Sequence, residues 1–260
     1  PIPIDGPPGP DPERLVVDRW RSHLGPDGLV HRIENGRSHL WPRTPDHPLF
    51  GTAVVAVADL GVDAEDDAVA DHAVAVPVAI DALGSTTVLT GPRSHQLAVA
   101  RHIVLSLAAT IHPRHLRIGL HSELPDLALA RRLPHAAEPA PSRRTGTRPT
   151  LLVIDQDRSA GATTSSTGAR SRWPVLADGG ALLILGRDGD LAPRKANWVT
   201  LRRGGAVEVE APGLGPTIRA ETPAGIGPVL ADELAERLST IEVDDPRGRA
   251  PRAPVRTDRR

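Results

Sequence analysis

The sequence predicts an α/β fold in which a mostly parallel β-sheet is flanked by helices, with an additional β-rich part. Several short apolar runs are continuous, turn residues separate them, and two segments have the length and spacing of helices. A continuous run of Val, Leu and Ile is typical of a strand covered on both faces, as in a parallel sheet between helices. The order of strand, tight loop, helix and strand is that of a doubly wound sheet.

The expected elements follow in order along the chain. The Pro- and Gly-rich opening PIPIDGPPGPDPE indicates a linker, and a short helix is expected over 13–24. Helices are expected over 94–111 and over 225–240, the second with Pro228 near its first turn. The region 142–172 is expected to carry mobile loops around one strand. The expected strands are 52–58, 73–80, 86–90, 116–120, 151–154, 181–185, 198–201 and 206–209.

Three regions are expected on this basis. Residues 1–33 are the linker and short helix, 34–242 form the α/β domain, and 243–260 form a tail rich in Arg and Pro that should be disordered. The chain starts at Pro1 and contains no methionine, which favours a piece cut from a longer polypeptide.

Composition excludes several classes of function. The chain has no cysteine, so it can hold no disulfide, thiolate zinc site or cysteine nucleophile. A formal net charge of -1 argues against a globally electrostatic nucleic-acid binder. The longest apolar stretch, 103–111, is about half of what a bilayer span requires. We therefore expect a soluble domain without redox chemistry of its own.

One segment, TTVLTGPRSHQLAVARHIVLSLA, has the layout of a phosphate-binding loop: an apolar strand, a glycine, a short loop and a long helix. A working loop reads G-x-x-x-x-G-K-[ST], because the lysine neutralises phosphate and the hydroxyl binds magnesium. Counted from Gly91, that spacing puts Gln96 at the second glycine, Leu97 at the lysine and Ala98 at the hydroxyl. All three requirements fail, and the sole lysine, Lys195, follows an arginine.

A strand-end acid is the second feature that phosphate-loop folds require. The run LLVIDQD supplies Asp155, for which a solvated acid is favoured over a metal role. The free N–H groups at the start of the 94–111 helix could still attract an anion. The residues at which residual nucleotide or phosphate binding is expected are therefore Gly91, Arg93, Ser94 and Asp155.

Four segments in the same order carry a resemblance to a known family. They are NGRSHLWPRTPDHPLFGTAVVAVADLG, VPVAIDALGSTTVLTGPRSHQLAVARHIVLSLAATIHPRHLRIGL, RRLPHA and RPTLLVIDQD. Over roughly 34–242, the chain resembles actinobacterial FtsK/SpoIIIE-type translocases, including the EccC component of type VII secretion. It departs from their pattern before the LPHA step, where Arg131 and Arg132 replace a tryptophan.

The resemblance implies a degenerate ATPase-like domain that lies between membrane helices and the first true ATPase domain. It implies a non-catalytic chain with a P-loop-NTPase-like fold, no cofactor and no metal of its own, because ATP and magnesium are bound in other domains. The implied partners are other domains of the same translocase and neighbouring subunits, with the membrane reached through segments outside this chain. The implied location is the cytoplasmic face of the cell membrane. Whether the cargo is DNA or protein stays open.

Other residues admit a second interpretation. A metal site at His112, His115 and His121 is weighed against surface or capping histidines, which are favoured. A serine nucleophile at Ser94 beside His95 is disfavoured because the G-x-S-x-G elbow is missing. Core or interface anchoring is favoured over base stacking for Trp20, Trp41, Trp173 and Trp198. Two other functions stay open: a weakly active NTPase that uses Arg93 and Asp155, and a DNA-contacting module that acts through the Arg-rich tail.

Overall fold

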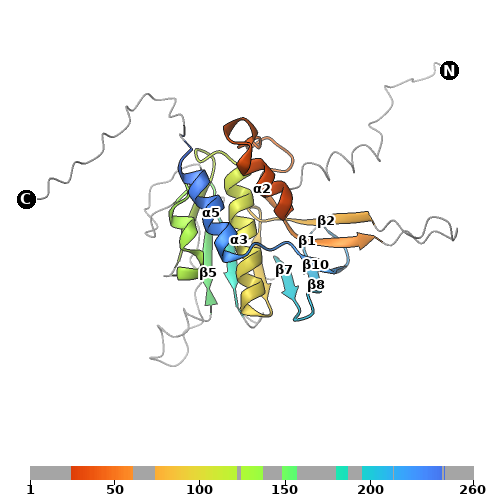
Figure 1. Cartoon of the computed structure of the whole chain (residues 1–260). Coiled ribbons are helices and arrows are strands. Elements are labelled where there is room, and N and C mark those ends of the chain that lie inside the picture. The colour runs from red at the N-terminus through yellow and green to blue at the C-terminus, as the bar shows by residue number, and fades with distance from the viewer. Residues whose placement is uncertain are drawn as a thin grey trace, which may run out of the picture.

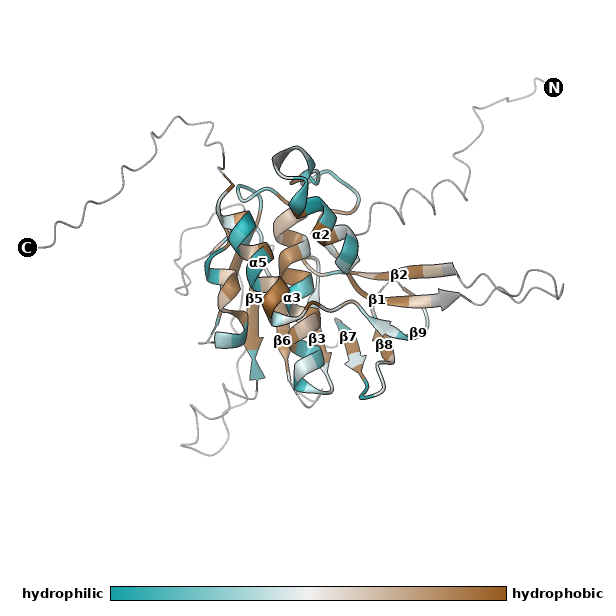
Figure 2. Ribbon diagram, in the orientation of Figure 1, coloured by the Kyte–Doolittle hydropathy of each residue, from teal (hydrophilic) through white to brown (hydrophobic). Residues whose placement is uncertain are grey.

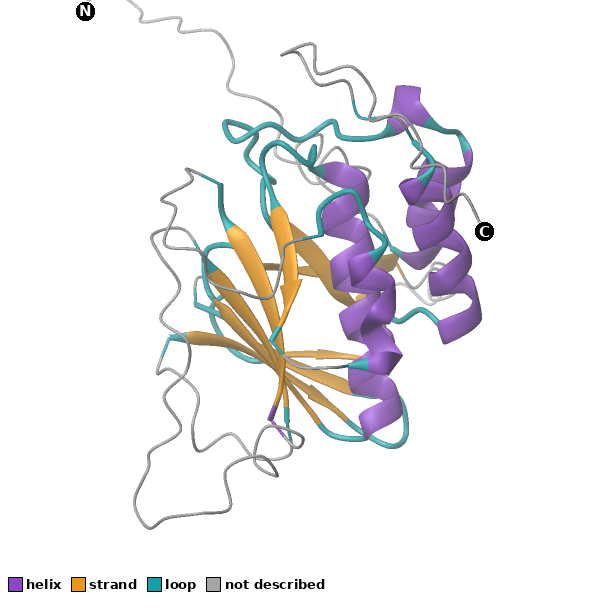
Figure 3. Ribbon diagram, turned by 90° about the vertical axis from the view of Figure 1, so that its left-hand side faces the viewer, coloured by secondary structure: helices purple, strands orange, loops and turns teal. Residues whose placement is uncertain are grey.

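The computed structural model describes residues 25–60, 74–121, 124–136, 148–156, 180–186, 195–212, 214–241 and 243. Two sheets and three α-helices form the described part (Figure 1). The helices gather on one face of the larger sheet, as the view in Figure 3 shows. The predicted α/β fold, a mostly parallel sheet flanked by helices with an additional β-rich part, is therefore confirmed.

The larger sheet has seven strands in the order β4-β5-β6-β3-β7-β8-β9. All pairs from β4 to β7 are parallel, and β8 and β9 continue the sheet in antiparallel fashion. The central strand β3 pairs with both β6 and β7, so that Leu89 lies opposite Leu185 on one side and Val199 on the other. The strands are β3 (Thr86–Thr90), β4 (Arg117–Leu120), β5 (Thr150–Asp155), β6 (Ala181–Leu185), β7 (Ala196–Leu201), β8 (Val207–Glu210) and β9 (Ile218–Ala220).

The smaller sheet has the order β10-β1-β2 and is antiparallel. It consists of β1 (Thr52–Leu60), β2 (Val74–Asp81) and the two-residue β10 (Thr222–Pro223). A register shift between Val54 and Ala56 marks a bulge in β1, which increases the local twist of the hairpin. In Figure 1 the β1–β2 hairpin projects beyond the helices and the larger sheet.

Helix α3 (Arg93–Thr110) lies at the centre of the helical layer, between α2 (Pro26–Glu34) and α5 (Pro228–Ser239). Its residues from Gln96 to Thr110 are buried apart from Ala98, and much of the helix is coloured apolar in Figure 2. Helix α2 buries Leu29 and Ile33 in the same core, so the packed unit includes residues ahead of the boundary expected at residue 34. Two short 3-10 helices, η1 (Arg37–His39) and η2 (Pro125–Arg131), complete the layer.

Strand residues alternate between two hydrophobic clusters because successive side chains point to opposite faces of a sheet. Leu89, Val153 and Leu185 belong to the main core with α3. Their neighbours Val88 and Ile184, together with Ile154, belong to a second cluster on the opposite face. Continuous apolar runs were expected to be covered on both faces, and the strands β3, β5 and β6 have this pattern.

The eight expected strands and the two expected long helices are present, with ends shifted by at most three residues. The helix expected over 13–24, most of the loops expected over 142–172 and nearly all of the 243–260 tail lie outside the described residues. The sequence did not predict α2, η1, η2, β9 and β10, which are short elements. Within the part that the structure describes, no helix is long and apolar enough to cross a membrane.

Candidate functional site at the carboxyl edge of the larger sheet

Three neighbouring parallel strands end on the same side of the larger sheet, which we call its carboxyl edge. Because β5, β6 and β3 are adjacent and parallel, their carboxyl ends bring Asp155, Gly186 and Gly91 together. Ligands of open α/β sheets bind outside the carboxyl ends of such strands. This edge is therefore the place where a functional site is expected.

The turn from β3 to α3 consists of only Gly91 and Pro92. Gly91 has a φ of 106°, and a Cβ there would lie 1.9 Å from the carbonyl oxygen of Leu201 in the neighbouring strand β7. Pro92 is the N-cap residue and has no N–H. Its carbonyl accepts the backbone N–H groups of His95 and Gln96. The turn is too short to wrap a phosphate group in backbone N–H donors.

Because this turn is short, the residues compared with a phosphate loop lie further into the helix than that loop would place them. Leu97 and Ala98, which the spacing placed at the lysine and hydroxyl positions, lie in the second turn of α3. Leu97 is buried in the core, and the Cβ of Ala98 lies 3.0 Å from where a side chain of Gly225 would begin. The residues that start the helix are Arg93 and Ser94. The residues that a phosphate loop would place between strand and helix belong to the helix in this chain.

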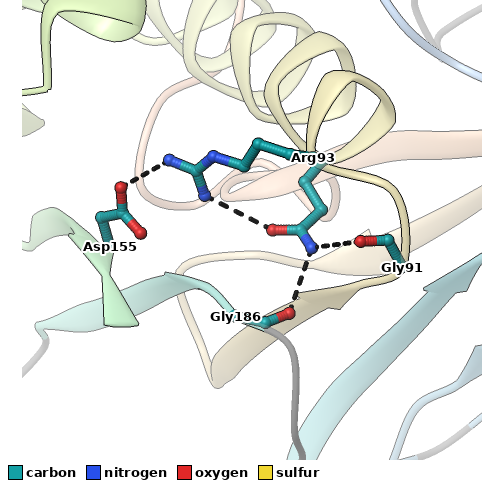
Figure 4. A network of polar contacts seen from close by, with 5 residues as sticks. Gly91, Arg93, Asp155 and Gly186 are labelled. Carbon is teal, nitrogen blue, oxygen red and sulfur yellow. Dashed lines mark hydrogen bonds and ion pairs between the residues drawn. The ribbon is translucent and has the colours of Figure 1, made fainter. Parts of the chain in front are cut away.

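Arg93 and Asp155 form an ion pair across this edge (Figure 4). The Nη2 atom of Arg93 lies 2.6 Å from Oδ2 of Asp155. The Asp155 side chain is 1% exposed and that of Arg93 is 32% exposed. The expectation of a solvated acid at the strand end was wrong, because Asp155 faces the helix side of β5 and is buried with a charged partner. A charge-assisted bond of this length is a strong one.

Gln96 bonds to the ends of two neighbouring strands. Its buried side-chain amide donates to the carbonyl oxygens of Gly91, at 2.7 Å, and Gly186, at 3.1 Å. Its Oε1 atom accepts a long contact of 3.5 Å from Nη1 of Arg93. The sequence reasoning noted Gln96 only as a departure from a glycine and missed this role. A polar residue at the start of an apolar helix was the one available signal.

The structure thus brings together three of the four candidate residues, Gly91, Arg93 and Asp155. Ser94 is exposed in the first turn of α3 and makes none of the hydrogen bonds of this network. The close fit extends to Gly186, where a Cβ would lie 2.3 Å from Oε1 of Gln156. The arrangement neutralises the buried carboxylate from within the chain and fastens β5, β6 and β3 to the first turn of α3.

The opposite end of α3 is closed by side chains and backbone from two distant segments. The last carbonyl groups of a helix lack partners within the helix. Here Nε1 of Trp41 donates to Ala108 at 3.0 Å, its backbone N–H donates to Ala109, and the N–H of Arg43 donates to Thr110. Nε2 of His135 lies 2.7 Å from the carbonyl oxygen of Ile111. Trp41 adopts a φ of 58° to make these bonds.

Two groups in this closure have lowered pKa values. Burial lowers the pKa of His135 to about 4, against the opposing effect of its bond to Ile111. Burial and the nearby charge of Arg32 lower the pKa of Arg43 to about 10. Arg43 stays charged at neutral pH, and Nη1 donates to the carbonyl oxygen of Thr52 at 2.8 Å. His135 is neutral, so the LPHA segment supplies an uncharged donor to the core.

The other residues singled out in the sequence are scattered. His112 and His115 share the turn after α3, with ring centroids 6.4 Å apart, whereas His121 follows β4 at the opposite edge. Among the described residues, no group of three or more His, Cys, Asp or Glu side chains could hold a metal ion. Trp198 packs on the second hydrophobic cluster, and Arg132 pairs with Asp232 of α5. Trp20 and Trp173 lie outside the described residues.

No protein-family model matches the chain, and no curated protein matches it. Among solved structures, it is similar to the cytoplasmic domain of the type VII secretion ATPase EccC of Thermomonospora curvata, with a TM-score of 0.55 and 12% identity over 85% of this chain and 35% of that chain. ATPases 2 and 3 of the same EccC with a signal sequence peptide give a TM-score of 0.48, 13% identity and coverage of 77% and 50%. ATPases 2 and 3 of EssC from Geobacillus thermodenitrificans give a TM-score of 0.48 and 9% identity over 76% of this chain and 50% of that chain. The chain spans about a third of the length of the first of these, and its fold is similar to that of the EccC cytoplasmic domain.

Proposed function

We propose that this chain is a non-catalytic structural and coupling domain of a membrane-anchored, ATP-driven translocase of the FtsK/SpoIIIE or EccC type. The observation that carries the proposal is the ion pair between Arg93 and the buried Asp155, which lies under a two-residue turn. The similarity in fold to the EccC cytoplasmic domain and the four ordered sequence segments support the choice of parent protein.

The proposal follows from what phosphoryl transfer requires. Catalysis needs backbone N–H groups around the phosphates, a mobile cation, and an acid that is available to magnesium or water. In this chain one of the two turn residues is a proline, and Arg93 neutralises Asp155. The amide of Gln96 is bonded to both neighbouring strand ends. The acid and the cation that would have to meet a nucleotide are therefore already paired with each other.

The remaining parts of the proposal concern the parent protein. The domain, expected over 34–242 and extended here by α2, couples membrane segments outside this chain to ATPase domains that bind ATP and magnesium. Its partners are those domains and neighbouring subunits, and its location is the cytoplasmic face of the cell membrane. The coding sequence on either side tests this assignment. Membrane spans upstream and Gly-Lys-Ser/Thr loops downstream are the expected outcome, and their absence contradicts it.

Titration of the full chain with Mg-ATP, followed by calorimetry and by phosphate release, tests the lack of catalysis directly. We expect neither binding heat at micromolar nucleotide nor turnover, with or without Arg93. Micromolar binding together with hydrolysis that is lost in Asp155→Asn overturns the proposal. An Arg93→Gln variant serves as the matched control, because it exposes Asp155 without adding a phosphate loop.

The competing functions make different demands. A weakly active NTPase needs Arg93 to leave Asp155 and meet phosphate, so its phosphate site would disappear in Arg93→Gln. A DNA-contacting module acting through the 243–260 tail, which lies almost entirely outside the described residues, would bind DNA with an affinity that falls as salt rises. Removal of residues 244–260 would abolish that binding and leave nucleotide titrations unchanged.

A further inference from the structure

Three exposed arginines lie at the edge of the larger sheet where its parallel strands begin, which we call the amino edge. Arg114 belongs to the turn after α3, Arg117 begins β4, and Arg148 precedes β5. The backbone N–H of Arg117 donates to the carbonyl oxygen of Pro149, the residue after Arg148. Burial and the charges of Arg114 and Arg148 lower the pKa of His115, so both guanidinium groups lie near this imidazole. We call Arg114, Arg117 and Arg148 the basic patch.

The charges of the basic patch are not paired within the described part of the chain. The ion pairs there join other arginines to acids, whereas the guanidinium groups of the patch pair with no described carboxylate. Like charges that share a surface repel each other. An anion that binds there is therefore attracted by the patch and also relieves this repulsion. Arg93 at the carboxyl edge differs, because Asp155 of the same chain neutralises it.

The position of Arg114 is fixed by two histidines that leave its charge unpaired. Its Nε atom donates to Nε2 of His115 at 2.8 Å, and its backbone N–H donates to Nδ1 of His112 at 3.1 Å. The His112 ring in turn packs edge-on against Trp41, with ring centroids 4.8 Å apart. A guanidinium held in this way keeps its Nη donors for an anion and loses little conformational freedom when it binds one.

The number of charges limits the kind of partner. Each arginine close to an anionic membrane strengthens adsorption about fivefold, so the three together strengthen it roughly a hundredfold. A gain of this size is too small to capture a partner that is free at micromolar concentration. It is large enough for a surface beside which the chain is already held, because the contact is then intramolecular.

We propose that the amino edge faces the membrane and that the basic patch binds the phosphate groups of anionic phospholipids. The proposal rests on the proposed function, because it needs a chain that is anchored beside a membrane, and it adds which side of the domain faces the lipid. Guanidinium groups suit this partner because they bind phosphate oxygens in a bidentate manner. The 18 residues of α3 span about 27 Å, so the carboxyl edge faces away from the lipid.

The contact should stay at the level of the lipid head groups. The exposed large hydrophobic residues among the described ones belong to the loop before β9 and to α5; they are Leu214, Val229 and Leu230. The basic patch therefore has no such side chain of its own to insert among lipid chains, and none on which nucleic-acid bases could stack. Adsorption through charge alone is reversible and weakens as salt rises.

Flotation of the full chain with vesicles tests the contribution of the patch. At about 0.1 M salt, where the Debye length is about 10 Å, we expect stronger binding to vesicles that contain phosphatidylglycerol than to pure phosphatidylcholine vesicles. Arg114→Gln/Arg148→Gln should weaken the binding about thirtyfold. The control Arg202→Gln/Arg203→Gln removes as much charge from the exposed turn after β7 and should weaken it less than about threefold. The Arg-rich tail is present in every variant, so it contributes equally to all.

Spin labels test which edge faces the lipid. The chain has no cysteine, so single labels can be attached to Ala136→Cys and Ser94→Cys. Ala136 is exposed and pairs with Ile118, next to Arg117, whereas Ser94 is exposed at the carboxyl edge. A lipid-bound nickel chelate should relax the label at residue 136 more than the label at residue 94.

Three results would overturn the proposal. They are equal binding of the native chain to anionic and neutral vesicles, equal losses in the patch variant and its control, and stronger relaxation at residue 94 than at residue 136. Loss of binding to a DNA duplex in the patch variant, with vesicle binding unchanged, would assign the patch to nucleic acid instead. Nucleotide plays no part in these measurements, so failure of this contact and failure of the proposed function are distinguished by the separate titration with Mg-ATP.

Discussion

The carboxyl edge and the amino edge of the larger sheet differ in how their charged side chains are paired. At the carboxyl edge, Arg93 neutralises Asp155, and Gln96 satisfies the carbonyl oxygens of two strand ends. At the amino edge, where the parallel strands begin, Trp41 and His135 satisfy the end of α3 with uncharged donors, while Arg114 and Arg117 nearby are exposed. One edge is closed upon itself, and the other presents charge to the surroundings.

The largest expected effect lies in the turn that closes the carboxyl edge. Gly91→Ala should destabilise the protein by about 4 kcal/mol or more, because the new Cβ would meet the backbone of Leu201 at 1.9 Å and the φ of 106° disfavours it. Urea unfolding followed by circular dichroism measures this loss. The control Gly204→Ala, which meets nothing within 4 Å, should change stability by less than about 0.5 kcal/mol. Equal effects of the two substitutions would mean that the edge is not closed.

The ion pair should give the next largest effect. Arg93→Leu should cost about 3 kcal/mol, because it leaves the buried carboxylate of Asp155 without its guanidinium. Addition of Asp155→Asn removes the buried charge and should recover most of the loss. Chemical unfolding of the two single variants and the double variant measures the coupling. Additive losses in the double variant would contradict a direct pairing.

The stability of the protein should depend on pH through His135, which bonds to the end of α3 with an uncharged side chain. The pKa of His135 is lowered to about 4, so between pH 6.5 and 4 the unfolded chain takes up a proton that the folded chain does not. Stability should therefore fall as pH falls through this window, by about 2 kcal/mol between pH 7 and 5. Unfolding of the native chain and of His135→Gln at both pH values measures it. The variant should lose less on acidification, and equal losses would rule out His135 as the cause.

The smallest expected effect concerns the indole at the end of α3. Trp41→Phe removes the donor to Ala108 and should cost about 1 kcal/mol. Trp198→Phe is the matched control, because the structure gives its indole no hydrogen bond to lose and packing against the second cluster is retained. Thermal unfolding of both variants would show whether the capping bond, and not aromatic size, accounts for the loss.

Much of the fold could be predicted because apolar runs identify strands that are buried on both faces. The runs around Leu89, Val153 and Leu185 are continuous for that reason, and each became a parallel strand. The start of α3 was predicted within one residue, but the spacing counted from Gly91 did not show that the connecting turn has only two residues. The role of Gln96 was equally hidden, because its partners Gly91 and Gly186 are backbone carbonyls that any residue would supply. Short elements such as β10 owe their existence to tertiary pairing and leave no periodic signal.

The cation that neutralises Asp155 is a side chain of the same polypeptide, so every molecule carries it whatever the solution contains. Proteins whose strand-end acids are satisfied by a bound ion or nucleotide melt at a temperature that follows the concentration of that ligand. The guanidinium of Arg93 removes this dependence at Asp155. The stability of this part of the fold should therefore not depend on the concentration of a metal ion or nucleotide.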